Sequence, residues 1–361
     1  MSRLREHLVS LIAAEGPISV ATYMQAVLAH YYAKSDPFGA RGDFITAPEI
    51  SQVFGELIGA WCVAVWEQLG SPPRFSLIEL GPGRGTLMRD VLRAARVRPA
   101  FREAADVVFV ELSPGLREQQ REALRESKVR SVEWRDEFEA PAGQPLIVIA
   151  NEFFDALPIE QFVMTHQRWR ERRIGVGGNG ELGFVLSPTA LPRDSFPLAS
   201  ALCVEGAMFE LGPMRTAVAE RIGASITAQG GAALVIDYGF LGPAVGDTLQ
   251  AMRGHKFESV LAEPGHADVT AHVDFAALAA GLVRGGADVY GPVAQGALLH
   301  RLGGRERTAA LAARATPAQR EALEIGYKRL TEDELMGSLF QALVAASPGL
   351  LPPGFGSHER R

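Results

Sequence analysis

Short apolar runs alternate with segments of helical periodicity through the middle of the chain. Each run is followed by a polar or glycine-rich turn, and then by apolar residues that recur at helical spacing. The runs that predict buried strands cover residues 75–80, 107–111, 132–135, 146–150 and 233–238. Helices are expected between them, over residues 86–97 and 116–126. Buried strands that alternate with helices predict an α/β fold with a parallel, doubly wound sheet.

Two regions depart from this alternation. Before the first strand, helical periodicity covers residues 3–13, 20–33 and 50–69. This predicts a helical N-terminal cap. After Pro158, segments 160–173 and 181–186 have the pattern of strands, joined by a glycine-rich hairpin turn at 177–180. A helix follows over about 208–228, so we expect a β-hairpin and helical region inserted into the α/β domain.

The C-terminal part returns to the core pattern. A helix is expected over residues 274–283, then an antiparallel closing hairpin of segments 288–293 and 297–302, and then helices over 305–345. The expected organisation is a helical cap with a lid loop (1–70), an α/β core (71–160 and 230–305), an inserted substrate-recognition region (161–229), and C-terminal helices with a tail (306–361).

Composition narrows the class of protein. The chain has 361 residues, of which 47% are hydrophobic and 22% charged, so it has enough apolar material for a sizeable core. Its formal net charge of −6 disfavours a protein built to bind nucleic acid. No apolar run approaches the ~18 residues of a membrane span. The two cysteines cannot form a disulfide framework or a cysteine-rich zinc site, and no export signal begins the chain.

The strongest local motif is a glycine-rich turn between a buried strand and a helix. It reads Glu79-Leu-Gly81-Pro-Gly83-Arg-Gly85, and a helix is expected from the next residue. Glycines allow a sharp turn and close approach of a ligand to the backbone. Dinucleotide-binding enzymes carry G-x-G-x-x-G, whereas here the third glycine comes one residue earlier. That spacing, with Glu79 before it, favours S-adenosylmethionine (SAM) over NAD; a plain tight turn is the simpler alternative.

Polar residues follow three other strands of the predicted sheet. Glu111 ends the second strand, where an acid can accept hydrogen bonds from both ribose hydroxyls of a nucleotide. Asp136 follows the third strand, where it can accept from an adenine amino group. Asn151, Glu152 and Asp155 follow the fourth. Because ligands of open α/β sheets bind at the carboxyl ends of strands, we expect these residues at one site. Solvated carboxylates or helix caps are the alternatives.

Several longer segments resemble one family. They are ELGPGRG (79–85), NEFFDALP (151–158), GDFITAPEIS (42–51), VIDYG (235–239), DTLQAMRGHK (247–256) and PGHADVTAHVDF (264–275). Together these segments resemble the MidA-like family of SAM-dependent methyltransferases, which includes the mitochondrial complex I assembly factor that acts on protein arginine. The resemblance runs from about Leu4 to Phe340, nearly the whole chain.

The resemblance implies a fold, a cofactor and a substrate class. It implies a Rossmann-like methyltransferase sheet, SAM as cofactor, and Glu79, Gly81, Gly83, Gly85, Glu111, Asp136 and Asn151 as cofactor-binding residues. The methyl acceptor it implies is an arginine of a protein, with a respiratory complex I subunit as one candidate. The expected compartment is the bacterial cytoplasm, or the mitochondrial matrix for a eukaryotic source. No metal ligand set is expected, because the histidines near residues 255–272 match no recognised spacing.

Methylation of arginine gives carboxylates near the acceptor a specific role. The guanidinium is essentially always protonated, and carboxylates can hold it and draw its charge away from the attacking nitrogen. Glu152 and Asp155 are the expected pair, and Asp43 and Glu49 belong to a loop, 36–49, that we expect to close over the site as a lid. A loop that only buttresses the first helices is the alternative. Three other functions stay open: an assembly chaperone with weak catalysis, a methyltransferase with a small-molecule acceptor, and an NAD-dependent oxidoreductase.

Overall fold

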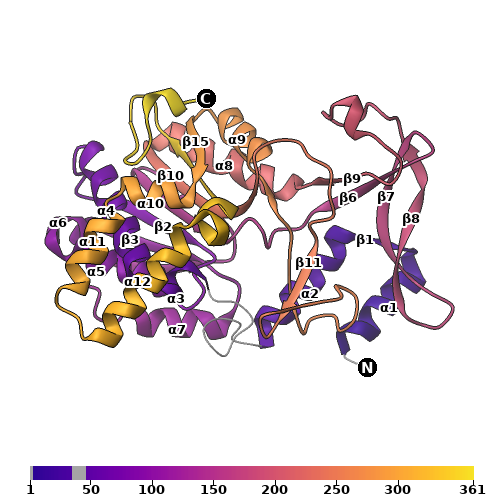
Figure 1. The fold of residues 1–361 in the computed structure, drawn as a ribbon, viewed down its shortest axis with the longest axis horizontal. Coiled ribbons are helices and arrows are strands. Elements are labelled where there is room, and N and C mark those ends of the chain that lie inside the picture. Colours follow the sequence, from indigo (N-terminus) through magenta and orange to yellow (C-terminus); the bar gives the residue numbers. More distant parts are fainter. Residues whose placement is uncertain (1–2, 35–45) are drawn as a thin grey trace. The chain divides into compact units, whose positions relative to one another are not determined.

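The computed structural model describes residues 3–34 and 46–361, which form two compact units. One unit contains the described residues up to Lys34, together with 155–217 and 240–277. The other contains the remaining stretches, from Thr46 to Phe154, 218–239 and 278–361. Each unit is therefore assembled from three separated pieces of chain (Figure 1). The units divide the chain differently from the expected segments: residues 46–70 and 306–361 share a unit with the large sheet, and residues 240–277 do not.

The larger unit is built around a doubly wound sheet, as the sequence predicts. Its parallel strands are β2 (Phe75–Leu80), β3 (Ala105–Val110), β4 (Ser131–Arg135), β5 (Leu146–Asn151) and β10 (Gly231–Phe240). The strand order is β15-β16-β10-β5-β2-β3-β4. The chain therefore builds outward from β2 in one direction through β3 and β4, and in the other through β5 and β10. The point of reversal lies between β2 and β5, where open α/β sheets place their ligands.

Two predictions are wrong at the edge of this sheet that β15 and β16 form. β16 (Phe340–Ala346) is antiparallel to both β10 and β15 (Asp288–Ala294), and every one of its residues is buried. The sequence analysis assigned residues 340–345 to a helix, because Ala, Leu and Gln favour helices and a short apolar run has no diagnostic period. The expected closing strand over 297–302 is wrong for the same reason, since α10 (Gln295–Arg301) occupies that stretch.

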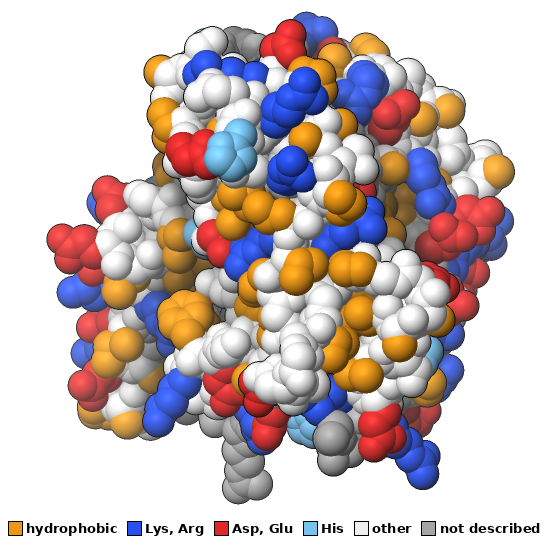
Figure 2. Space-filling view, turned by 90° about the vertical axis from the view of Figure 1, so that its right-hand side faces the viewer, with side chains coloured by type: hydrophobic (Ala, Val, Ile, Leu, Met, Phe, Trp, Pro, Cys, Tyr) orange, Lys and Arg blue, Asp and Glu red, His pale blue; other side chains and the backbone are white. Residues whose placement is uncertain are grey.

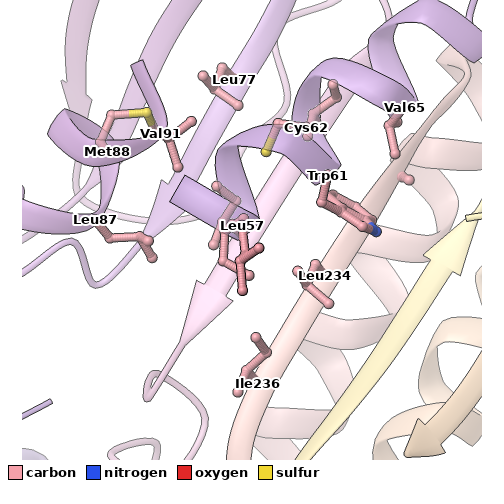
Figure 3. Packing of buried hydrophobic residues seen from close by; sticks show 14 of the residues in the cluster. Leu57, Trp61, Cys62, Val65, Leu77, Leu87, Met88, Val91, Leu234 and Ile236 are labelled. Carbon is pink, nitrogen blue, oxygen red and sulfur yellow. The ribbon is translucent and has the colours of Figure 1, made fainter. Parts of the chain in front are cut away.

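Helices pack against this sheet and extend its core. They are α3 (Ala47–Ile50), α4 (Gln52–Gln68), α5 (Thr86–Ala94), α6 (Pro99–Ala104), α7 (Pro114–Leu124), α11 (Gly304–Ala312) and α12 (Pro317–Thr331). Figure 3 shows apolar side chains of α4, α5, β2 and β10 gathered together, Trp61 and Met88 among them. α4 approaches α5 closely because of two glycines. A Cβ added at Gly55 would lie 2.6 Å from the Asp90 Cβ, and one at Gly59 would lie 2.8 Å from the Val91 carbonyl oxygen.

The smaller unit combines helices with two antiparallel sheets. It contains α1 (Arg3–Glu15), α2 (Val20–Lys34), β1 (Ile18–Ser19), β6 (Glu160–Thr165), β7 (Arg168–Val176), β8 (Leu182–Leu191), β9 (Met208–Leu211), β11 (Gln250–Arg253), β12 (Lys256–Glu258), β13 (Asp268–Thr270) and β14 (Val273–Asp274). The larger sheet has the order β1-β7-β6-β9, with β8 paired to β7. α8 (Pro213–Gln229) and α9 (Phe275–Arg284) each begin in this unit and end in the other.

The insertion has two more strands than the sequence predicts. The expected strand over 160–173 is two strands, because the chain turns at His166 and Gln167, which have φ values of 49° and 61°. Neither residue is a glycine or proline, so the turn has no composition signal. The expected hairpin turn at 177–180 is present between β7 and β8. The helix expected from about 208 begins only at Pro213, after β9.

The surface carries side chains of every class. Figure 2 shows one face, on which apolar side chains lie among acidic and basic ones. Such a mixture is ordinary for folded proteins, whose surfaces are largely apolar by area. Within residues 3–34 and 46–361, no helix is both long enough and apolar enough to cross a membrane.

Candidate active site

The glycine-rich turn leaves β2 and leads directly into α5. Gly81, Gly83 and Gly85 all have positive φ values, of 61°, 53° and 77°. Side chains disfavour this left-handed region, because the Cβ approaches the following carbonyl oxygen. A Cβ on Gly81 would also lie 3.1 Å from the Phe153 ring, which is closer than ordinary contact. The backbone path of the turn therefore requires glycine, as the sequence predicts for a loop that a ligand approaches.

Glu79 completes the start of α5. Gly85 is the N-cap residue and has no side chain to cap the helix, and the Glu79 carboxylate accepts a hydrogen bond from the backbone N–H of Met88 in its first turn. The side chain is buried, and its Oε2 has no partner among the described residues. Burial raises the pKa of the Glu79 carboxyl well above its usual range. An unpartnered buried oxygen at the carboxyl end of β2 is suited to a ligand's hydrogen-bond donor.

This raised pKa makes a prediction about stability. The Glu79 carboxyl binds its proton more tightly in the native protein than in the unfolded chain, so it adds to the free energy of unfolding. This contribution is fully present below the unfolded pKa of about 4.3 and is lost as pH rises through the folded pKa. In the ligand-free protein, the free energy of unfolding should fall with pH more steeply than in Glu79→Gln, by up to about 1.4 kcal/mol per pH unit in that window. Urea unfolding at several pH values measures both slopes. Parallel curves for the two proteins contradict the prediction.

Glu111 lies just after β3, at the same edge of the sheet. It is 8% exposed, and its Oε1 accepts a hydrogen bond of 2.8 Å from the Ser113 N–H. Its Oε2 lies 3.4 Å from the Gln120 amide nitrogen. Burial raises the pKa of this carboxyl, and the hydrogen bonds and the nearby Arg117 oppose the shift. A carboxylate held in this way at the carboxyl edge of the sheet agrees with the predicted role of Glu111 as an acceptor for ribose hydroxyls, which stays a prediction.

Removal of this carboxylate should weaken cofactor binding specifically. We expect Glu111→Ala to cost about 1.5–3 kcal/mol in binding of S-adenosylhomocysteine (SAH), the range for hydrogen bonds to a charged group. Isothermal titration calorimetry measures the loss, and circular dichroism checks that the fold is retained. An unchanged dissociation constant in a folded variant places the ribose elsewhere.

Asp136, which follows β4, is held by a residue that the sequence analysis did not single out. The Arg117 Nη2 donates to the Asp136 Oδ1 at 2.5 Å, and the Arg117 Nε donates to the Glu111 carbonyl oxygen at 2.8 Å. The Asp136 side chain is 78% exposed. Its second oxygen leaves acceptor capacity for an adenine amino group, the role expected for it.

The end of β5 carries two polar side chains that contact each other. The Asn151 Nδ2 donates to the Glu152 Oε1 at 3.1 Å, and the Ala47 N–H donates to the same oxygen at 3.1 Å. The Asn151 Oδ1 is buried and has no partner among the described residues. Glu152 has a φ of 51°, a conformation that costs energy for a non-glycine residue and that clusters at functional sites. Its backbone is fixed there by a hydrogen bond from its N–H to the Ile236 carbonyl oxygen.

The other predicted acids have separate surroundings. The Glu49 Oε1 accepts a hydrogen bond of 2.6 Å from the Thr86 hydroxyl, at the start of α5, so Glu49 lies beside the glycine turn. Asp155 is buried and belongs to the smaller unit, where its Oδ1 accepts from the Ala156 N–H and its carbonyl oxygen accepts from Arg215. A clamp shared by Glu152 and Asp155 therefore stays a prediction. Asp43 and most of the expected lid lie outside the described residues.

Asp237 is a further acid at this edge. It lies in the buried part of β10, is itself fully buried, and accepts hydrogen bonds of 2.9 Å from the N–H groups of Phe154 and Tyr238. It therefore fixes the turn that follows Glu152. Its signal in the sequence is an acid after an apolar run, the same signal that identified Glu111.

The residues at this edge fit an adenosine-containing cofactor. Two unpartnered buried oxygens, on Glu79 and Asn151, end the strands on either side of the point where the strand order reverses. The glycine turn lies beside them, and Glu111 follows the next strand. A cavity of about 280 Å³ in the same unit is lined by five arginines, and none of the predicted site residues lines it. In the described part of the chain, no three His, Cys, Asp or Glu side chains are arranged to hold a metal ion.

Comparison with known proteins gives relatives over nearly the whole chain. Residues 57–293 match the family described as "Putative S-adenosyl-L-methionine-dependent methyltransferase". The chain is 38% identical to the mitochondrial protein arginine methyltransferase NDUFAF7 homolog of Drosophila melanogaster, over 96% of this chain and 85% of that protein. It is 36% identical to the human mitochondrial protein arginine methyltransferase NDUFAF7, over 92% of this chain and 81% of that one.

One solved structure shares the fold over almost the full length. It is a Burkholderia thailandensis protein bound to S-adenosyl-homocysteine, with a TM-score of 0.83 and 24% sequence identity. The alignment covers 99% of this chain and 95% of that one. The shared architecture thus includes both the sheet and the segments outside it.

Proposed function

We propose that this chain, which belongs to a family of S-adenosyl-L-methionine-dependent methyltransferases, methylates arginine side chains of a protein. The choice of acceptor rests on one observation. Over more than nine-tenths of its length, this chain is similar to proteins named protein arginine methyltransferases. The positions of the carboxylates at the end of β5 and in α3 support this choice, since an arginine acceptor is cationic.

The cofactor-binding residues divide into four groups, according to the part of the ligand that each contacts. The glycine turn lets the backbone approach the ligand, Glu111 accepts from the ribose hydroxyls, and Asp136 accepts from the adenine amino group. The unpartnered oxygens of Glu79 and Asn151 accept from donors on the amino-acid part of the ligand. When bound, SAM supplies a methyl group on a positively charged sulfur.

Glu152 is the residue that we assign to the acceptor. Its carboxylate is oriented by the Ala47 N–H and the Asn151 amide, which both contact Oε1. A carboxylate that pairs with one side of a guanidinium concentrates positive charge there, so the nitrogen on the other side becomes a better nucleophile. The methylated nitrogen must lose one proton, and a carboxylate is a suitable proton acceptor. Glu49, in the same unit, is the next carboxylate that we assign to this task.

The identity of the protein acceptor and the compartment are further proposals. The relatives compared above are named mitochondrial, which supports a mitochondrial location, for which we propose the matrix, if the source is eukaryotic. For a bacterial source we propose the cytoplasm. A respiratory complex I subunit is the acceptor that the family resemblance implies.

Labelled methyl transfer tests this function. The protein is incubated with radiolabelled SAM and a lysate, and the labelled proteins are hydrolysed to amino acids. We expect the label in methylarginine, and no labelling with the Gly83→Val variant. Label in small molecules alone contradicts the protein acceptor. A protein that binds SAH but transfers no label contradicts catalysis and favours an assembly chaperone.

A further inference from the structure

Gln120 connects three parts of the cofactor site that are distant in sequence. It lies in α7 and is fully buried. Its amide nitrogen donates to the Gly83 carbonyl oxygen at 2.6 Å and lies 3.4 Å from the Glu111 Oε2. Its amide oxygen accepts from the indole N–H of Trp134, in β4, at 2.7 Å. One side chain therefore contacts the glycine turn, the acid after β3 and the strand next to it.

These partners allow only one orientation of the amide. The nitrogen faces two acceptors and the oxygen faces one donor. A rotated amide would place its oxygen against the Gly83 carbonyl and the Glu111 carboxylate, and its nitrogen against the Trp134 N–H. Glutamate cannot replace the amide, because its carboxylate would face two acceptors. The contacts therefore require a glutamine and fix its orientation.

The backbone of α7 lies close to the same turn. A Cβ on Gly85 would lie 3.4 Å from both the Cα and the Cγ of Gln120, which is ordinary contact distance. Helix and turn are thus packed together, and the Gln120 side chain passes from one to the other. Because Gly83 is buried, its carbonyl needs a hydrogen-bond partner, and the Gln120 amide supplies one.

We propose that Gln120 is a positioning residue for SAM binding, which fixes the Gly83 peptide relative to the Glu111 carboxylate. This inference rests on the cofactor site proposed above. The ligand's ribose must meet Glu111 while its other part meets the glycine turn, so binding depends on the separation of these two groups. Gln120 sets that separation without touching the ligand, because all three of its polar contacts are with protein groups.

The test compares the same substitution at two neighbouring positions. Gln120→Met keeps the length and volume of the side chain and removes its hydrogen bonds. Gln119→Met makes the same change one residue away, where a helical side chain faces a different direction. We expect Gln120→Met to weaken SAH binding about 10-fold or more, as measured by calorimetry, and Gln119→Met to change it less than about twofold. At saturating SAM, the kcat of Gln120→Met and its KM for the acceptor should stay within about twofold of the wild-type values.

A second readout separates positioning from a general loss of stability. Loss of the amide donor removes a hydrogen bond to the charged form of Glu111, so its pKa should rise further. The charged group that faces Glu111 is Arg117, which is paired with Asp136 after β4. Both remain in the variant. We therefore expect the acid limb of SAH binding to move to higher pH in Gln120→Met and to stay in place in Gln119→Met.

Trp134→Phe provides a milder variant if Gln120→Met does not fold. It removes the donor to the Gln120 oxygen and keeps an aromatic ring, although a smaller one, beside Phe109 and Arg121. We expect SAH binding to weaken by about fivefold, with the same direction of pH shift. Unchanged affinity and an unchanged pH limb in a folded Gln120→Met, or in Trp134→Phe, overturn the proposal. Wild-type protein that binds no SAH overturns the cofactor site itself, which is a distinguishable result.

Discussion

Replacement of Gly83 with valine should abolish binding of SAM and SAH. Gly83 has a φ of 53°, which costs an ordinary side chain roughly 1–2 kcal/mol and is worse for a β-branched one. The valine side chain would also lie in the turn that the ligand approaches, and the altered backbone would displace the carbonyl that Gln120 holds. A ligand that binds only the native state raises its melting temperature. We expect saturating SAH to raise the melting temperature of the wild type and to leave that of Gly83→Val unchanged.

The matched control is Gly180→Val, in the turn between β7 and β8. Gly180 has a φ of 77°, and a Cβ there would have no atom within 4 Å. Gly180→Val has a backbone strain similar to that of Gly83→Val, but it lies outside the proposed cofactor site. It should lose some stability and keep its full response to SAH. A Gly83→Val protein that responds to SAH as the wild type does contradicts the position of the cofactor site.

Glu152→Gln should separate catalysis from cofactor binding. The amide oxygen can still accept from the Ala47 N–H, so the local structure should survive. The negative charge is lost, and with it the interaction that holds and polarises a cationic acceptor. We expect kcat to fall by roughly 10²–10³-fold, the usual effect of removing one electrostatic contact at a reacting centre. The SAH dissociation constant should change less than about threefold, since the change acts on the acceptor.

Glu205→Gln is a suitable control for this change. The Glu205 Oε2 accepts a hydrogen bond from the His166 N–H at 2.9 Å, so it too is a carboxylate that accepts from a backbone N–H. It lies in the smaller unit, in the segment that follows β8. We expect its kcat to equal that of the wild type. Full turnover in Glu152→Gln contradicts the role assigned to the carboxylate and leaves the cofactor site unaffected.

The sequence predicted the core strands and their polar ends well. β2 has the expected bounds, and β3, β4, β5 and β10 differ only at their ends, because fully buried parallel strands are continuous apolar runs. The same logic located Glu111 and Asn151, since a polar residue at the end of such a run lies at the carboxyl edge of the sheet, whereas Glu79 was identified by its place before the glycine motif. Parallel strands bring these ends to one edge of the sheet, so the position of each residue in the chain was sufficient to predict that they lie at the same edge.

Residues that act through tertiary contacts had no comparable signal. Gln120 and Arg117 lie in α7, whose pattern distinguishes its buried face from its exposed face but says nothing about which strand ends that face meets. β16 was missed because the short run Phe340–Ala346 has no diagnostic period, and its position between β10 and β15 depends on long-range pairing. The turn at His166 and Gln167 depends on backbone conformations that composition does not predict.

A crystal structure of this chain grown with SAH tests the account most directly. The account predicts SAH at the carboxyl edge of the large sheet, between the ends of β2 and β5, with its ribose hydroxyls on Glu111. It also predicts hydrogen bonds from the ligand to the Glu79 Oε2 and the Asn151 Oδ1, two buried oxygens that have no partner among the described residues. SAH bound in the arginine-lined cavity, or at the edge with both oxygens still unpartnered, contradicts the account.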